Sequence, residues 1–209
     1  MTSVINPPAG EQYRFPLSFA QQRLWFLAQL EAPGAAYTVR LPVRLTGPLD
    51  AARLQAALDQ VVARHEALRT TFGMEDGLPV QVVHERFPVT VEMHDATGLD
   101  DAALRIRVGE LADTVLDLEM GPLLRACLLR MSAEDHVLLL LTHHIISHDW
   151  SSGLLFRHLA TRYATGEAPA EPPALKSRES FSLIGTPQKM KNARAIVTGK
   201  AVYGIDAEI

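Results

Sequence analysis

The chain has 209 residues, a formal net charge of −4 at pH 7 and a single cysteine. This length allows one hydrophobic core or slightly more, and the mild charge gives no attraction to nucleic acid or to an anionic membrane. Apolar runs such as residues 137–141 are far shorter than the roughly 20 residues of a membrane span. Residues 1–12 lack the basic and apolar regions of a secretory signal. A lone cysteine excludes an internal disulfide and fits a reducing compartment, so we expect a cytoplasmic protein. From the charge and the short apolar runs we expect no nucleic-acid and no membrane partner.

The composition changes near residue 175. All four lysines lie in residues 176–209, and a stretch rich in proline and alanine, residues 167–174, precedes them. Such a stretch is typical of an extended linker. We therefore expect four segments: a flexible N-terminus over 1–12, a folded lobe over 13–166, a linker over 167–182 and a poorly packed tail over 183–209.

The sequence of the first part of the lobe predicts two helices and several strands. Apolar residues at helical spacing, including Phe19, Leu24 and Leu27, indicate a helix over residues 19–30, with Leu24 and Trp25 in the core. Alternation over residues 37–45 indicates a strand with one buried face. Asp50 is a good N-cap for a second helix. The apolar face of that helix is made of Leu54, Ala57, Leu58, Val61 and Val62. Short strands are expected over 68–72, 80–83 and 89–93.

The sequence of the second part of the lobe predicts two more helices and two buried strands. Asp100 can cap a helix that runs to Leu116. The apolar runs over 123–130 and 137–142 are typical of central strands with both faces covered, and we expect Cys127 to be a buried core thiol. Helical spacing returns over residues 150–163. Because helices and strands are interspersed, the predicted fold class is an α/β sandwich in which helices pack a mixed sheet.

Two adjacent histidines, His143 and His144, follow directly on the expected strand of residues 137–142. A histidine held at the end of a buried strand is well placed to act as a general base near neutral pH. Three interpretations remain: a structural pair satisfied by the backbone, catalysis by one histidine, or a metal site that uses His144 and His148. Spacing does not separate the first two. We predict no metal there, because no third ligand follows at a typical spacing.

Three motifs, in chain order, resemble those of nonribosomal peptide synthetase condensation domains. They are LSFAQQRLWFL over residues 17–27, RHEALRTTF over 64–72 and HHIISHDWS over 143–151. The third is similar to the HHxxxDGWS motif of that family. The resemblance covers about residues 13–175. It implies a chloramphenicol-acetyltransferase-like sandwich, of which this chain has the N-terminal lobe and lacks the C-terminal one.

The resemblance implies amide-bond formation between thioesters in nonribosomal peptide synthesis, a route to antibiotics and other secondary metabolites. It also implies that the substrates are attached to the phosphopantetheine arms of peptidyl carrier proteins, so that no cofactor is bound directly. The implied partners are those carrier proteins and the adjacent synthetase modules. The second histidine, His144, would position or deprotonate the attacking amine or stabilise the charged intermediate. The remaining expectations are site support from His143, His148, Asp149 and Ser151, and structural roles near the site for Arg64, Arg69 and Trp150.

The chain departs from the family pattern at two adjacent positions. His148 stands where the motif has aspartate, and Asp149 where it has glycine. Loss of a buried carboxylate leaves its cationic partner without a counter-charge, which typically costs about 3–5 kcal/mol. We therefore expect a weakened or altered site. Because one lobe cannot enclose a tunnel, we also expect no catalysis by the chain alone.

Two further alternatives remain, the first favoured by these departures and the second raised by the shared histidine pair. One is a carrier-docking module without chemistry, and the other is a coenzyme-A-dependent acyltransferase of the wider HHxxxDG group. Separately, residues 183–209 resemble the opening segment of the large subunit of molybdenum-dependent aldehyde and isoquinoline oxidoreductases. That short resemblance implies no molybdopterin binding and no redox activity.

Overall fold

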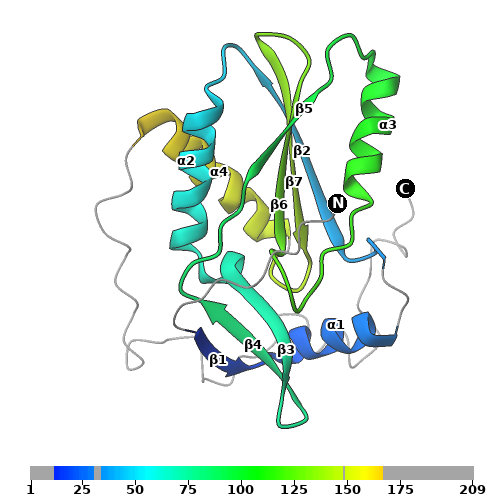
Figure 1. The fold of residues 1–209 in the computed structure, drawn as a ribbon, viewed down its shortest axis with the longest axis vertical. Coiled ribbons are helices and arrows are strands. Elements are labelled where there is room, and N and C mark those ends of the chain that lie inside the picture. Colours follow the sequence, from blue (N-terminus) through cyan, green and yellow to red (C-terminus); the bar gives the residue numbers. More distant parts are fainter. Residues whose placement is uncertain (1–11, 31–33, 148, 167–209) are drawn as a thin grey trace, which may run out of the picture. The chain divides into compact units, whose positions relative to one another are not determined.

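The computed structural model describes residues 12–30, 34–147 and 149–166 (Figure 1). All of them lie in the first of two compact units, which spans Met1–Ala170. The elements in chain order are β1 (Gln12–Pro16), α1 (Phe19–Leu30), β2 (Thr38–Thr46), α2 (Ala51–Arg64), the 3-10 helix η1 (Glu66–Arg69), β3 (Thr70–Glu75), β4 (Leu78–His84), β5 (Val91–Asp95), α3 (Asp101–Ala112), β6 (Leu124–Arg130), β7 (Asp135–His143) and α4 (Asp149–Thr165).

A four-stranded mixed sheet forms the centre of the described fold. Its strand order is β2-β7-β6-β5. The β2–β7 and β6–β7 pairs are antiparallel, whereas β5 and β6 are parallel and are connected through α3. Pro42 is tolerated in β2 because that strand is at the sheet edge, where a missing N–H leaves no central ladder bond unmade. The sheet thus confirms the predicted α/β class.

Helices cover both faces of this sheet, with α2 and α4 on one face and α3 on the other (Figure 1). Side chains alternate along β6, so Ala126 and Leu128 pack with α2 and α4 whereas Cys127 and Leu129 pack with α3. Most of β6 and nearly all of β7 are buried. This confirms the expectation of central strands covered on both faces, and of Cys127 as a buried free thiol.

The helix N-caps are where the sequence places them. The Asp50 carboxylate accepts a hydrogen bond from the Arg53 N–H at 3.0 Å, and the Asp100 carboxylate accepts one from the Ala103 N–H at 2.8 Å. The five apolar residues predicted for the second helix are all buried. The helix that begins after Asp100 ends at Ala112, however, and its predicted extension to Leu116 is wrong. The Thr114 hydroxyl donates to the Leu111 carbonyl at 2.8 Å, and the chain then leaves the helix axis.

A second sheet, which the sequence did not predict, contains β1, β4 and β3 in that order, all antiparallel. In Figure 1, α1 lies beside this sheet. A third apolar cluster connects this part of the fold to the end of the central sheet. Its buried members are Leu17, Phe72, Leu116, Leu118, Leu123 and Ile145.

Several predicted details of this region are corrected. Gln12, assigned to the flexible N-terminus, is the first residue of β1, and Leu68, assigned to a strand, lies in η1. Leu24 and Trp25 pack against the third cluster but are only partly buried, and Phe19 is 91% exposed. Among the described residues, no helix has both the length and the hydropathy needed to cross a membrane.

Candidate active site

A tight turn at the end of β7 holds the predicted histidine pair. The His143 N–H donates to the Leu123 carbonyl at 3.0 Å, which continues the β6–β7 ladder to the last residue of the strand. The Ile146 N–H then donates back to the His143 carbonyl at 3.1 Å and closes the turn. The hydroxyls of Thr142 and Ser147 share a hydrogen bond of 2.6 Å beneath it. These bonds hold the two histidines rigidly at the end of a buried strand.

His143 is the buried member of the pair and is held in its neutral form. Its side-chain Nδ1 accepts a hydrogen bond from the Ile145 N–H at 3.1 Å, so the proton of the neutral ring is on Nε2. Burial, with a smaller contribution from the charge of His144, lowers the pKa of His143 to about 4. His143 is therefore uncharged near pH 7, and its bond to the backbone supports the shape of the turn.

His144 is the exposed member of the pair. Its backbone N–H donates to the Tyr37 carbonyl at 2.8 Å, which fixes the residue against the start of β2. Alternation along the turn sends His143 and Ile145 inward and leaves the His144 side chain at the surface. In the part of the chain that the structure describes, no side-chain hydrogen bond of His144 is found, so its imidazole is open to a substrate.

A pocket of about 280 Å³ lies beside this turn, and His143 rather than His144 is among its lining residues. Tyr37 and the segment from Val115 to Glu119 form other parts of its wall. The rings of Tyr37 and His143 lie 6.2 Å apart between centroids. The lining is both polar and apolar.

The other predicted residues of the third motif are described only in part. His148 lies outside the described residues, and so do the side chains of Asp149 and Trp150, although both residues belong to α4. Ser151 is half-buried and lines a small pocket together with His65 and Ser147. The structure therefore brings Ser151 near the turn, and the supporting roles of His148, Asp149 and Trp150 stay predictions.

The two arginines of the second motif occupy different surroundings. Arg69 donates from its guanidinium to the His84 carbonyl and lies 3.5 Å from the largely exposed Glu66 carboxylate. Its Nε is buried and has no hydrogen-bond partner among the described residues. Arg69 thus connects η1 to β4, and no buried carboxylate among the described side chains offsets its charge. Arg64, half-buried, ends α2.

A pair of histidines near Arg64 was not found from the sequence. His65 Nε2 and His158 Nδ1 are 2.8 Å apart, and the two rings stack with centroids 5.0 Å apart. One nitrogen must donate and the other accept. Burial lowers the pKa of both rings, and the charges of Arg64 and Arg162 lower it further. This contact joins the end of α2 to α4, and no sequence signal connects positions 93 residues apart.

The buried histidines predict a pH-dependent stability. The folded pKa of His143 is about 4 and the ordinary value is 6.5, so the unfolded chain takes up the proton first as the pH falls. Folding free energy is then lost below pH 6.5, by about 2 kcal/mol at pH 5 from His143 alone. Lowered pKa values of His65, His84 and His158 act in the same direction.

Urea denaturation between pH 7.5 and pH 5 measures this effect. The matched variant is His143→Asn, whose amide oxygen can accept the Ile145 N–H but does not titrate. We expect a shallower pH dependence for this variant than for the parent chain. Equal slopes for the two proteins would show that His143 is not held neutral by the fold.

The fold and the turn together define an α/β sandwich with a rigid histidine pair at the end of a central strand. The condensation-domain family model matches residues 11–195, and the chain belongs to this family of nonribosomal peptide synthetase domains. The match reaches into the segment 183–209. The resemblance of that segment to molybdenum-dependent oxidoreductases receives no support from these comparisons and stays a prediction.

Several large synthetases are similar to the same part of the chain. Chondramide synthase cmdD of Chondromyces crocatus is 43% identical over 162 residues, which are 76% of this chain and 4% of that protein. Cyclosporin synthetase simA of Tolypocladium inflatum is 41% identical over 78% of this chain and 1% of its own length. The chain thus spans only a few per cent of these relatives.

Solved structures agree with the fold. The first condensation domain of the CDA synthetase is 26% identical, with a TM-score of 0.68 over 76% of this chain and 43% of that one. The X-domain from teicoplanin biosynthesis is 36% identical, with a TM-score of 0.68 over 79% of this chain and 36% of that one. The described fold therefore corresponds to less than half of each solved chain.

Proposed function

We propose that this chain provides one lobe of an amide-forming condensation site, in which His144 acts on the attacking amine of a carrier-bound substrate. The observation that carries this proposal is the turn after β7, where a buried neutral His143 holds the shape and His144 alone of the pair is exposed. An amine must lose a proton as the amide forms, and a solvent-accessible imidazole near neutral pH is suited to take or stabilise that proton.

The substrates in this proposal are aminoacyl or peptidyl thioesters on the phosphopantetheine arms of peptidyl carrier proteins. The synthetases that match the chain support carriers and adjacent modules as its partners. The pocket beside His143, whose lining is both polar and apolar, supports an entry for the substrate arm next to the turn. No separate cofactor takes part in this proposal, since the reacting groups arrive already activated as thioesters.

A second lobe completes the proposed site. The solved chains are more than twice as long as the part that corresponds to this chain, and His144 lies at a surface with no enclosing wall among the described residues. A tunnel that excludes water needs a surface on each side of the reacting atoms. We therefore infer that residues 13–166 alone do not catalyse amide formation. In this proposal residues 167–182 are a linker and residues 183–209 are a distinct segment.

The experiment supplies loaded donor and acceptor carrier proteins to the chain, with and without the second lobe of a related condensation domain fused after residue 166. We expect the amide product, detected by mass spectrometry on the acceptor carrier, only when both lobes are present. Repeated turnover by the 209 residues alone would refute the need for a second lobe. No product from the fusion would refute the catalytic role of this lobe.

Carrier docking without chemistry is a second candidate function, favoured by one observation. Arg69 is a mostly buried cation whose Nε lacks a partner among the described residues, and its one described carboxylate neighbour, Glu66, is largely exposed. Carrier binding by the fusion without amide formation would support this candidate.

Restoring the motif tests whether positions 148 and 149 weaken the site. We expect the double change His148→Asp with Asp149→Gly, made in the two-lobed fusion, to raise the rate of amide formation by about tenfold or more, because a carboxylate again offsets a buried cation. The single change Asp149→Gly is the control and should leave the rate near that of the parent. An unchanged rate in the double variant would show that this pair is not the defect.

A further inference from the structure

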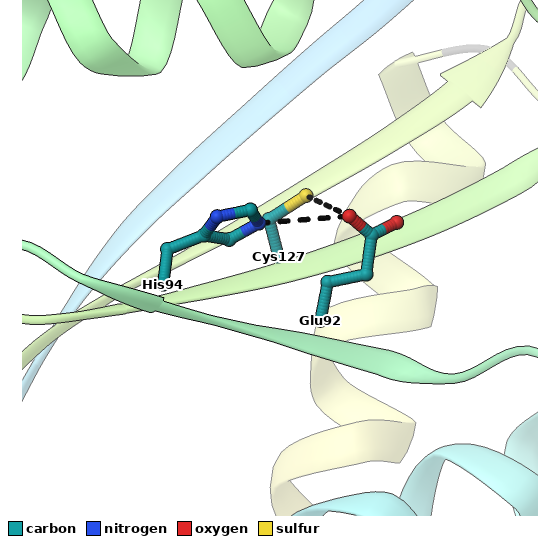
Figure 2. Close-up of side chains that lie close together, drawn as sticks. All are labelled: Glu92, His94 and Cys127. Carbon is teal, nitrogen blue, oxygen red and sulfur yellow. Dashed lines mark hydrogen bonds and ion pairs between the residues drawn. The ribbon is translucent and has the colours of Figure 1, made fainter. Parts of the chain in front are cut away.

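Three side chains with metal-binding chemistry meet on the α3-covered face of the four-stranded sheet, away from the histidine turn. Glu92 and His94 are two residues apart on β5 and so project to the same face. Cys127 lies on β6 in register with Glu92. Figure 2 shows the three side chains directed toward one another. The spacing of His144 and His148 gave no metal site, and the 32 positions that separate His94 from Cys127 in the sequence hide this cluster.

The distances in the cluster are close to those of a metal site. His94 Nε2 is 3.5 Å from Glu92 Oε2, and Cys127 Sγ is 3.9 Å from the same oxygen. All three potential ligand atoms lie within 4.8 Å of one another. Around a tetrahedral zinc ion with ordinary bond lengths, such atoms are about 3.3–3.6 Å apart. Small side-chain shifts are therefore enough to close the three ligands around one ion.

Without a metal, the cluster leaves polar atoms poorly satisfied. His94 Nε2 is buried and makes no hydrogen bond of good geometry to a described residue; its polar contact is the long one with Glu92 Oε2 at 3.5 Å. Burial raises the pKa of the Cys127 thiol to about 11, so the sulfur is protonated and offers only a weak contact to Glu92. Orphaned buried polar atoms are costly, and a bound cation would satisfy both the ring nitrogen and the sulfur.

The surroundings orient the carboxylate for this role. Arg125 donates to both Glu92 oxygens, at 2.5 and 2.6 Å, and holds the pKa of Glu92 below its ordinary value. The carboxylate is thus ionised, and Oε2 keeps a further lone pair directed at the cluster. Partners of this kind fix metal ligands in place.

We propose that Glu92, His94 and Cys127 form a three-ligand site for a divalent transition metal, with zinc the best match. Thiolate and imidazole ligands select zinc-like ions over calcium and magnesium, and a fourth position stays open to water. On binding, the sulfur–metal bond forms and the thiol proton passes to solvent. The ion would connect the edge strand β5, which supplies Glu92 and His94, to β6, which supplies Cys127. Cys127 is four residues after Leu123, which precedes β6 and bonds the His143 N–H, so it lies roughly 13 Å from the histidine turn.

Cobalt is the probe, because its spectrum reports thiolate coordination. The full chain is freed of metal with a chelator and titrated with Co²⁺. Cys127 is the single cysteine, so a near-ultraviolet sulfur-to-cobalt band can arise only there. We expect this band to saturate at one ion per chain, with strong visible bands of a four-coordinate ion, and to disappear when Zn²⁺ displaces the cobalt.

Ligand variants separate a built site from a reactive thiol. We expect His94→Gln to weaken Co²⁺ binding by about tenfold or more, Glu92→Gln to do the same, and Cys127→Ser to abolish the sulfur band. His136→Gln is the control, since His136 is a buried histidine of β7 outside the cluster. Circular dichroism checks that each metal-free variant is folded.

A second readout keeps the test decisive where a variant is less stable. Added Zn²⁺ should raise the Tm of the parent chain and of His136→Gln, and should raise the Tm of His94→Gln much less, because only an ion bound to the folded state stabilises it. His94 is on the edge strand, so its change should perturb packing least. Absence of the sulfur band, or equal cobalt affinity in the parent, His94→Gln and Glu92→Gln, would overturn the proposal.

Discussion

Replacing His144 by alanine in the two-lobed fusion is expected to lower the rate of amide formation by about 10²–10⁴-fold, the usual contribution of a general acid–base group. The fold should be unaffected, since the imidazole is exposed and makes no hydrogen bond to a described side chain. The backbone N–H that donates to Tyr37 is retained in the variant. The measurements are single-turnover product formation between loaded carriers and the Tm of each protein.

The variant His144→Gln distinguishes two ways in which this residue can act. Glutamine can hold an amine by a hydrogen bond but cannot take a proton near neutral pH. If His144 positions the amine, His144→Gln should keep much of the rate that His144→Ala loses. If it removes the proton, both variants should be equally slow and should lose the rise of rate with pH. A rate within about twofold of the parent in both variants would exclude a catalytic His144.

Replacing Phe72 by alanine is expected to give the largest loss of stability, about 3–5 kcal/mol. The Phe72 ring is 0% exposed and packs in the cluster that joins β3 to the histidine turn through Ile145. Removing it leaves a cavity that the surrounding strands cannot close, because the Phe72 N–H is itself bonded to the Leu118 carbonyl at 2.7 Å. Such a loss is a large part of the roughly 5–15 kcal/mol that typically stabilises a domain.

Urea denaturation monitored by circular dichroism measures this loss, and Phe72→Leu is the matched control. Leucine keeps most of the apolar volume, so we expect it to cost about 1–1.5 kcal/mol. Hydrogen exchange of the Ile145 and Ile146 amides should also become faster in Phe72→Ala, since the cluster supports the turn in which both take part. A loss below about 1 kcal/mol in Phe72→Ala would contradict the central position of this ring.

The candidate site was predictable where it depends on neighbours in the chain. The buried apolar run before His143 predicts a strand with the histidine pair at its C-terminal end. The structure has this arrangement, since β7 ends at His143. The sequence did not predict which face each histidine presents. That depends on the turn closed by the Ile146 N–H and on Tyr37, which lies in the turn before β2, about a hundred residues earlier.

The sequence by itself determined the local elements of this protein. Asp50 and Asp100 cap their helices because a carboxylate can bond an N–H three residues on, and alternating or continuous apolar runs define the strands β2, β6 and β7. These patterns depend on spacings of a few residues. They were sufficient for the α/β class and for the family, whose motifs are also local.

Only the tertiary structure decided the features that join distant parts of the chain. The strand β1 is exposed along its length and exists by pairing with β4, about 70 residues away. The stacked His65 and His158, and the cluster of Glu92, His94 and Cys127, likewise come from separate elements. The physical reason is the same in each case: strand pairing and side-chain contacts depend on register and packing between elements, and a linear sequence contains neither.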